Sequence, residues 1–311
     1  MMTENSFEVK TTAESGIYEG IRNLWCEVFG DEPEYVDGTY ENFGEDITGW
    51  AVTDGNGRVV SALSCYRCGT FRGQDVYVSY AVCTSPDHRG QGLAGMLVSR
   101  VKDEVLAGGG ISLVSPLDET LEAWYAELGY EPYFYAPRFT LFTTDDDEEY
   151  EDCSDYDIDI GDSEAFEAFA PGIDLKPADR DSYNRYREAF LANRPHVELS
   201  GRMLTQIEYE CYDDGGLCII NGGDAICDIS TAEGGSLIMT EFILSPVLEE
   251  LSLEIDAEIA TAAARQAGAF EVTYTRPGSL GCQSMAAGVK AFDPEEEGYE
   301  YSTAYFGHPI E

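Results

Sequence analysis

Basic side chains are scarce in this sequence. Lys and Arg together number 18 against 60 Asp and Glu, and only three His are present, so the formal net charge is −42 at pH 7. Binding of DNA, RNA or an anionic lipid surface requires Lys and Arg that neutralise phosphate groups. The composition therefore argues against nucleic acids and membrane surfaces as partners.

Long apolar runs are also missing. No segment approaches the roughly 20 apolar residues that span a bilayer, and residues 1–14 lack the apolar core of a signal peptide. We therefore expect a cytoplasmic location. Hydrophobic residues still make up 43% of the 311 residues and aromatic residues 12%, which is enough for packed cores. At about 150 residues per domain, the length predicts two globular domains.

The cysteines do not form the pattern of a disulfide framework or a metal site. Nine are scattered along the chain, an odd number, and many lie in apolar stretches, so we interpret them as reduced and mostly buried thiols. Cys65 and Cys68 form one CxxC, but a structural zinc site needs a second pair of ligands that neither His88 nor another CxxC supplies. We expect no metal.

An acidic segment divides the chain. Ten of the fifteen residues from 145 to 159 are Asp or Glu, which is typical of an exposed linker. Before it, Ile17, Ile21, Leu24 and Val28 have the spacing of one buried helical face. The turn Asp54-Gly55-Asn56-Gly57 predicts a hairpin within residues 50–64. Further strands are predicted at 76–83, 111–114, 132–135 and 139–142, and helices at 93–106 and 118–128, which is an α/β order.

A similar order returns after the acidic segment. Helices are predicted at 179–191 and 201–212, a hairpin around Asn221-Gly222-Gly223, and then a strand at 237–244, a helix at 253–267 and a strand at 270–275. This pattern favours an internal duplication. The alternative is that any α/β domain shows the same order.

The most informative segment is the turn from Arg89 to Gly95. A buried strand ends near Thr84, Pro86 interrupts it, and an Arg-Gly-x-Gly-x-Ala sequence leads into a helix. Gly90 and Gly92 allow backbone N–H groups to converge, and the helix N-terminus adds partial positive charge. Such a turn can hold a pyrophosphate. It differs from the Walker pattern, which needs Gly-Lys-Ser/Thr, and from the dinucleotide fingerprint near the start of a βαβ unit.

This segment resembles motif A of the GNAT superfamily of N-acetyltransferases, Arg/Gln-x-x-Gly-x-Gly/Ala, with Arg89, Gly92 and Ala94 at the three positions. The segment from Trp124 to Tyr130 (WYAELGY) resembles the family's aromatic-Tyr-x-x-x-Gly-aromatic segment. The resemblance covers residues 7–143. The whole chain is similar to the Eis type, in which a degenerate GNAT-like domain follows the active one.

The resemblance implies a fold and a domain division. The expected fold class is α/β of the α+β type, with tandem GNAT folds, each a mixed, mostly antiparallel central sheet flanked by helices. The expected units are a catalytic GNAT domain at 1–144, the acidic linker at 145–159, and a degenerate GNAT-like domain at 160–311. The second unit should not bind CoA, because Ser245 to Glu250 offers no Arg or Gly and two carboxylates. It is expected to shape the acceptor site or to support a homo-oligomer.

The resemblance also implies acetyl-CoA as co-substrate and assigns residues to it. The strand segment that would pair with the pantetheine arm and the loop that would bind the pyrophosphate comprise Val82, Cys83, Thr84, Arg89, Gly90, Gly92, Leu93, Ala94 and Gly95. Tyr125 stands at the position of the tyrosine that donates a hydrogen bond to the departing CoA sulfur. The alternatives are that Tyr125 only fills the core beside Trp124 and that Arg89 makes a surface ion pair.

The general base is not assigned. Some family members carry a Glu on the motif A strand, where Val76 stands here, and Asp75 faces the opposite side of the pleat. A water, another carboxylate, or the chain's terminal carboxylate at Glu311, as in Eis-type relatives, could serve.

The expected function is transfer of an acetyl group to a primary amine of a small molecule or peptide. A catalytically silent acyl-CoA sensor or an interaction module is the alternative. The acidic excess could steer a cationic acceptor, or it could simply be a solvated surface suited to high salt.

Overall fold

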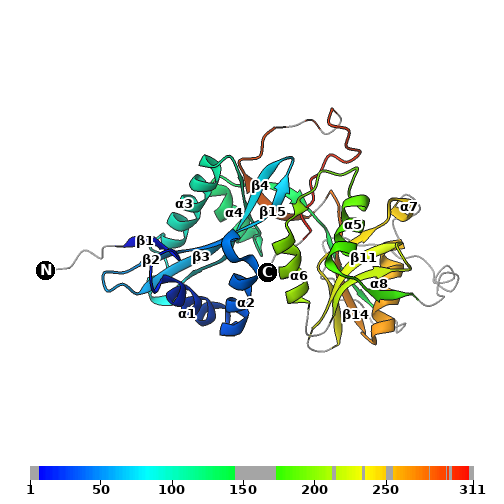
Figure 1. Ribbon diagram of the computed structural model, residues 1–311, viewed down its shortest axis with the longest axis horizontal. Coiled ribbons are helices and arrows are strands. Elements are labelled where there is room, and N and C mark those ends of the chain that lie inside the picture. The colour runs from blue at the N-terminus through cyan, green and yellow to red at the C-terminus, as the bar shows by residue number, and fades with distance from the viewer. Residues whose placement is uncertain are drawn as a thin grey trace.

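The structure, a computed structural model, describes residues 7–143, 173–211, 215–232, 235–249, 255–279, 281–291, 293 and 296–307. The segment 145–159, expected as a linker, lies outside these residues, and so does Glu311. The described chain forms two sheets with helices packed against them (Figure 1). Both sheets are mixed and mostly antiparallel, which confirms the predicted fold class.

The first sheet has eight strands. Its spatial order is β1 (Glu8–Thr11), β2 (Ile47–Thr53), β3 (Val59–Phe71), β4 (Gln74–Thr84), β5 (Ile111–Val114), β15 (Cys282–Ala287) and β6 (Glu131–Tyr135), with the short β9 (Glu198–Leu199) paired to β3. Only β4 and β5 run parallel. The predicted hairpin is confirmed, because β2 and β3 pair around a turn in which the Gly57 N–H bonds the Asp54 carbonyl at 2.9 Å.

Helices cover both faces of this sheet (Figure 1). They are α1 (Ile17–Phe29), α2 (Pro33–Phe43), α3 (Leu93–Ala107) and α4 (Glu119–Glu127), with single 3₁₀ turns η1 (Gly44–Asp46) and η2 (Pro86–His88). On one face α1 buries Ile17, Ile21 and Leu24, at the predicted spacing. On the other face Leu97 and Val101 of α3 join a separate core. The sheet thus separates two apolar layers.

The second sheet has seven strands. Its order is β7 (Arg138–Phe142), β14 (Glu271–Thr275), β12 (Ser236–Met239), β11 (Ala225–Ala232), β10 (Gly216–Ile220) and β8 (Leu175–Pro177), with β13 (Phe242–Leu244) also paired to β11. The helices of this half are α5 (Arg180–Phe190), α6 (Gly201–Glu210), α7 (Pro246–Glu249) and α8 (Ile255–Ala267). Here only β12 and β14 run parallel.

One predicted strand is wrong in detail. Residues 237–244 do not form a single strand but divide into β12 and β13. Between them the Glu241 N–H bonds Asp228 Oδ1 at 2.6 Å, and the fully buried Glu241 carboxylate receives Arg187 Nε at 3.1 Å and the Tyr183 hydroxyl at 2.8 Å. The inward turn satisfies this buried charge and interrupts the strand.

The two sheets exchange strands across the expected domain boundary. β7 follows β6 directly in sequence, yet it pairs with β14 in the second sheet, from Phe142 opposite Glu271 to Arg138 opposite Thr275. In return, β15 comes from the C-terminal part and lies between β5 and β6 of the first sheet. Ranges of consecutive residues therefore do not describe the two sheets.

The sheets repeat one connectivity, in agreement with the predicted internal duplication. In each, a hairpin (β2–β3 or β10–β11) precedes a strand, helix, strand unit with parallel strands (β4–α3–β5 or β12–α8–β14). The strand beside the last member is antiparallel to it in both sheets, and it is the exchanged one, β15 or β7.

Candidate active site

The two parallel strands of the first sheet separate toward their C-terminal ends. β4 and β5 pair only from Val76 opposite Ile111 to Val78 opposite Leu113. Farther along β4 a bulge places two residues, Ala81 and Val82, opposite one residue of β3, and Ala81 has a positive φ of 51°. A bulge bends the strand that carries it, and strained non-glycine backbone concentrates at functional sites. The bulged end of β4 is therefore the natural edge of a ligand site.

The predicted pyrophosphate loop follows this edge immediately. Gly90 and Gly92 have φ values of 74° and 76°, and Gly92 caps α3 without any side-chain hydrogen bond to the first helical turn. A Cβ added at either glycine meets no atom within 4 Å, so backbone conformation rather than packing requires glycine there. The loop residues 89–92 are exposed, and buried Leu93 anchors the start of the helix. The N–H groups at this helix end are available to an anion.

The remaining loop residues have clear positions. The Arg89 side chain is exposed, and its Nε donates to the Thr84 carbonyl at 3.2 Å, so it bridges the strand end and the loop. Cys83 is buried, while Val82 and Thr84 are half-buried at the end of β4. Ala94 and Gly95 lie in the first turn of α3, where a Cβ on Gly95 would come within 3.7 Å of the Trp124 ring. A side chain of one carbon at Gly95 would therefore make ordinary van der Waals contact with α4.

Tyr125 lies on α4 in the core between the sheet and α3. Its side chain is 7% exposed, with its ring centroid 4.8 Å from Trp124 and 5.9 Å from Tyr130. Burial raises the pKa of the Tyr125 phenol to about 12, so it stays protonated near neutral pH. It is a buried group that carries a proton.

The motif A strand offers no general base. Val76, where some GNAT relatives have a Glu, is fully buried opposite Ile111. Asp75 faces the other way and accepts a hydrogen bond from Arg67 Nε at 2.7 Å. Both positions agree with the alternation expected from the sequence. A base must come from a different element or from solvent.

A cluster that the sequence did not reveal lies beside the bulge. It consists of Trp25, Tyr35, Tyr66, Tyr80 and Glu210, and we call it the aromatic–carboxylate cluster. Its members come from α1, α2, β3, β4 and, for Glu210, from α6 of the second half. Ring centroids lie 5.1 Å apart for Trp25 and Tyr80 and 6.1 Å apart for Tyr66 and Tyr80. The tyrosines are spread along the sequence with no shared motif, so only the fold could bring them together.

The second half has no comparable loop among its described residues. After β13, Ser245 and the short helix α7 take the place of a glycine turn. The first turn of α8 carries Asp256, a buried carboxylate that accepts a hydrogen bond from the Tyr274 hydroxyl at 3.1 Å and lies 3.0 Å from Arg276 Nε. A carboxylate at this helix end disfavours a second anion there.

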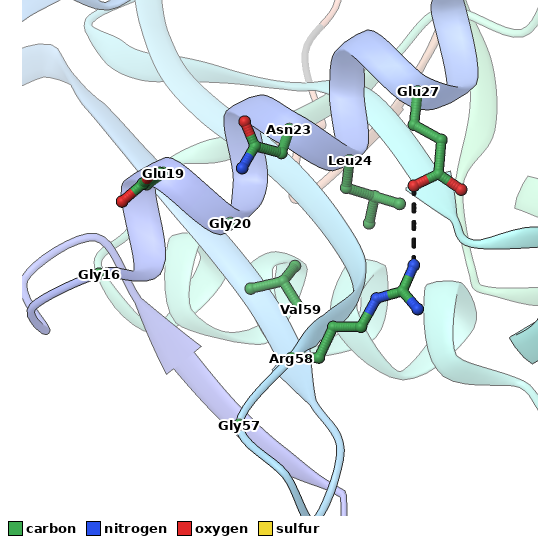
Figure 2. Close-up of a pocket in the computed structure, with 9 residues that line it drawn as sticks. All are labelled: Gly16, Glu19, Gly20, Asn23, Leu24, Glu27, Gly57, Arg58 and Val59. Carbon is green, nitrogen blue, oxygen red and sulfur yellow. Dashed lines mark ion pairs between the residues drawn. The ribbon is translucent and has the colours of Figure 1, made fainter.

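A cavity of about 350 Å³ lies between α1 and the β2–β3 turn, and the residues that line it are drawn in Figure 2. Glu19, Asn23 and Glu27 line it from the helix, and Arg58 lies opposite, with its Nη2 3.7 Å from a Glu27 oxygen. None of the predicted site residues lines this cavity. It is separate from the loop and from Tyr125.

The described residues contain neither a metal-site arrangement nor a membrane-spanning helix. No group of three or more His, Cys, Asp or Glu side chains there has the arrangement of a metal site. Cys65 and Cys68 are buried in different cores, Cys65 with α3 and α4 and Cys68 with α5 and α6. No helix in the described ranges has the length and apolarity needed to cross a membrane.

Comparison with protein-family models matches residues 45–132 to the acetyltransferase (GNAT) domain. This range contains the bulge, the loop and Tyr125. No curated protein gives a significant match.

Solved structures match over most of the chain. A probable N-acyltransferase from Enterococcus faecalis has 13% identity and a TM-score of 0.62, covering 90% of this chain and 72% of that one. A GCN5-related N-acetyltransferase from Anabaena variabilis has 15% identity and a TM-score of 0.59, with coverage of 90% and 72%. Eis1 from Mycobacterium abscessus has 12% identity and a TM-score of 0.53, with coverage of 88% and 67%. Residues 45–132 therefore match the acetyltransferase (GNAT) domain, and the chain as a whole shares the fold of these N-acetyltransferase structures.

Proposed function

We propose that this protein transfers an acetyl group from acetyl-CoA to a primary amine of a small molecule or peptide. The observation that carries the proposal is the position of the Gly90–Gly92 turn, which caps α3 directly after the bulged end of β4. Backbone N–H groups at a helix start suit a pyrophosphate, and the unpaired edge of a strand suits the amide groups of a pantetheine arm. Arg89 adds a cation to an otherwise acidic surface.

The proposed chemistry uses the backbone at the end of β4 and Tyr125, which lies in the core against which Val82 packs. Backbone groups of Val82 to Thr84 hold the thioester carbonyl and polarise it, and the neutral amine attacks its carbon. The carbon–sulfur bond then breaks, the sulfur leaves as a thiolate that the Tyr125 hydroxyl stabilises, and the proton lost from the attacking nitrogen passes to solvent.

Tyr125 acts in this scheme by hydrogen bonding rather than by full proton transfer. A thiol of the cysteine kind has a pKa of about 8.5, whereas the Tyr125 pKa is about 12. Moving the proton from phenol to thiolate is therefore uphill by about 3.5 units, or about 5 kcal/mol. A hydrogen bond keeps most of the stabilisation without that cost.

Calorimetric titration with acetyl-CoA tests the proposal. One site per chain is expected, because only the first half has the glycine turn within the described residues. Gly92→Asp should reduce binding below detection, since it places a carboxylate at the helix N-terminus where the pyrophosphate should lie.

A matched control separates this effect from backbone strain. Gly109 has a φ of 78° and, like Gly92, no atom within 4 Å of an added Cβ, but it lies beyond the other end of α3. Gly109→Asp should therefore bind acetyl-CoA like the parent. Equal affinities for the parent and Gly92→Asp, or two equivalent sites per chain, would refute the assignment of the loop. Binding without CoA release across a panel of amines would instead indicate an acyl-CoA sensor.

A further inference from the structure

We propose that the aromatic–carboxylate cluster is the anchor for a second, protonated amino group of the acceptor, so that the preferred acceptor is a diamine or polyamine. This inference rests on the proposed acetyl transfer and adds the substrate class. It also gives the second half of the chain a direct part in the site, because Glu210 belongs to α6.

The cluster adjoins the place where the chemistry is expected. Tyr80 immediately precedes Ala81, the residue with positive φ in the β4 bulge. Its ring packs edge to face against Trp25, and its hydroxyl lies 3.2 Å from the hydroxyl of Tyr35. The contacts of Tyr80 therefore connect the bulged strand β4 with α1, through Trp25, and with α2, through Tyr35.

Glu210 is held in place across the interface between the halves. Its Oε1 accepts hydrogen bonds from the Tyr35 hydroxyl at 3.2 Å and from Gln206 Nε2 at 2.9 Å. Gln206 is itself fully buried, and its Oε1 accepts a hydrogen bond from Asn42 Nδ2 of α2 at 2.9 Å. The carboxylate is thus oriented by both α2 and α6, yet Glu210 remains exposed enough to meet a ligand.

The charges around these hydroxyls are negative. Burial is the largest cause that raises the pKa of Tyr35 and of Tyr80, and the carboxylates of Glu210 and Asp31 raise both further. The phenols therefore stay neutral, and the carboxylates define the sign of the local potential. A cation is favoured there and an anion is excluded.

Tyr66 adds an unused hydrogen-bonding group. Its side chain is fully buried, and its hydroxyl has no hydrogen-bond partner within the described part of the chain. Buried polar groups normally have partners, so a hydroxyl of this kind is a candidate to be satisfied by a bound molecule. The Tyr66 ring stacks on Phe43, with centroids 4.2 Å apart, so the Tyr66 hydroxyl and the Glu210 carboxylate, rather than that ring face, are the groups that would bind an alkylammonium ion through hydrogen bonds.

The anchored group cannot be the one that is acetylated. A protonated amine has no lone pair with which to attack the thioester, so the reacting amine must be neutral and separate. An acceptor with two amino groups meets both requirements. This argument favours a diamine over a simple alkylamine of the same length.

The test compares 1,5-diaminopentane with n-pentylamine, which differ only in the second amino group. The parent should acetylate the diamine with a higher kcat/KM, and Glu210→Gln should lower that value about tenfold, mainly through KM. Glu210→Gln should lower the kcat/KM for n-pentylamine much less than the kcat/KM for the diamine. Glu208→Gln is the matched control, because Glu208 lies on the same helix but pairs with Arg180 at 3.0 Å, and it should behave like the parent.

Equal kcat/KM for the two amines in the parent, or an unchanged preference in Glu210→Gln, would overturn the anchor. Its failure can be distinguished from failure of the proposed function by titrating 1,5-diaminopentane calorimetrically without acetyl-CoA. Binding that weakens in Glu210→Gln and not in Glu208→Gln supports the anchor even if no acetyl transfer occurs. Binding that is the same in all three proteins, or absent from the parent, rejects it.

Discussion

At the scale of single residues, Tyr125 could be identified from the sequence, whereas the aromatic–carboxylate cluster around Tyr80 could be identified only from the fold. Tyr125 belongs to a local pattern, Trp124 to Tyr130, that resembles a family segment and could be named from the sequence. Glu210 belongs to no such pattern. It meets Tyr35, 175 residues away, only because α6 packs against α2. Residues that meet through long-range packing leave no signal in a single sequence.

Tyr125→Phe should lower kcat by roughly 30- to 150-fold, corresponding to a charge-assisted hydrogen bond of about 2–3 kcal/mol. The ring and its contacts with Trp124 and Tyr130 are kept, so the thermal midpoint and acetyl-CoA affinity should hardly change. Single-turnover kinetics measure the effect, because they isolate the chemical step. A Phe variant that matches the parent in that step identifies Tyr125 as a packing residue.

The pH profile offers a second check on the same residue. The raised pKa of about 12 means that the phenol remains a donor throughout the range in which the acceptor amine loses its proton. Activity should therefore rise with pH as the amine becomes neutral, without a falling limb from Tyr125 below about pH 11. A falling limb near pH 10 that disappears in Tyr125→Phe would contradict the raised pKa.

At the scale of helices and strands, local signals were sufficient where one segment folds against its own neighbours. The α1 spacing and the hairpin at residues 54–57 are of this kind. The sequence pattern does not predict α2, because PEYVDGTYENF is mostly polar and the helix buries only Val36, Thr39 and Phe43. The sequence pattern does not predict β15 either, because CQSMAA consists mostly of small residues and its partner strands are far away in the chain. The break between β12 and β13 depends on the buried partners of Glu241, which the local sequence does not show.

A chain of residues 1–143 should fail to form a cooperatively folded monomer. Without β15, the strand β5 loses the pairs that join Val114, Leu113 and Ser112 to Met285, Ala286 and Ala287. β6 loses its only strand neighbour in the first sheet. Open strand edges of this kind promote aggregation. Residues 1–137 joined to residues 281–291 by a flexible Gly/Ser linker form the matched comparison and should fold better, as measured by thermal unfolding and light scattering. A stable monomer of residues 1–143 alone contradicts the importance of the exchange.

At the scale of the whole molecule, the charge of −42 opposes the compact state through self-repulsion. Salt reduces the Debye length from about 10 Å at 0.1 M to about 3 Å at 1 M, so the repulsion is screened. The thermal midpoint should therefore rise between 0.1 and 1 M NaCl. Scanning calorimetry with an uncharged osmolyte of equal osmolality as comparison measures the electrostatic part. An unchanged midpoint would show that the acidic surface is energetically neutral.

The exchange of β7 and β15 also has a consequence for the order of events during synthesis. Ser115 and Ser284, whose hydroxyls hydrogen-bond at 2.7 Å, are separated by 169 residues, which a ribosome adds in roughly 10–30 s. Throughout that interval the nascent first sheet has a gap between β5 and β6, whereas every strand of the second sheet precedes β15 in the chain. The glycine loop and Tyr125 are therefore made early but gain their final support only when β15 leaves the ribosome, which couples the maturation of the site to synthesis of Cys282–Ala287.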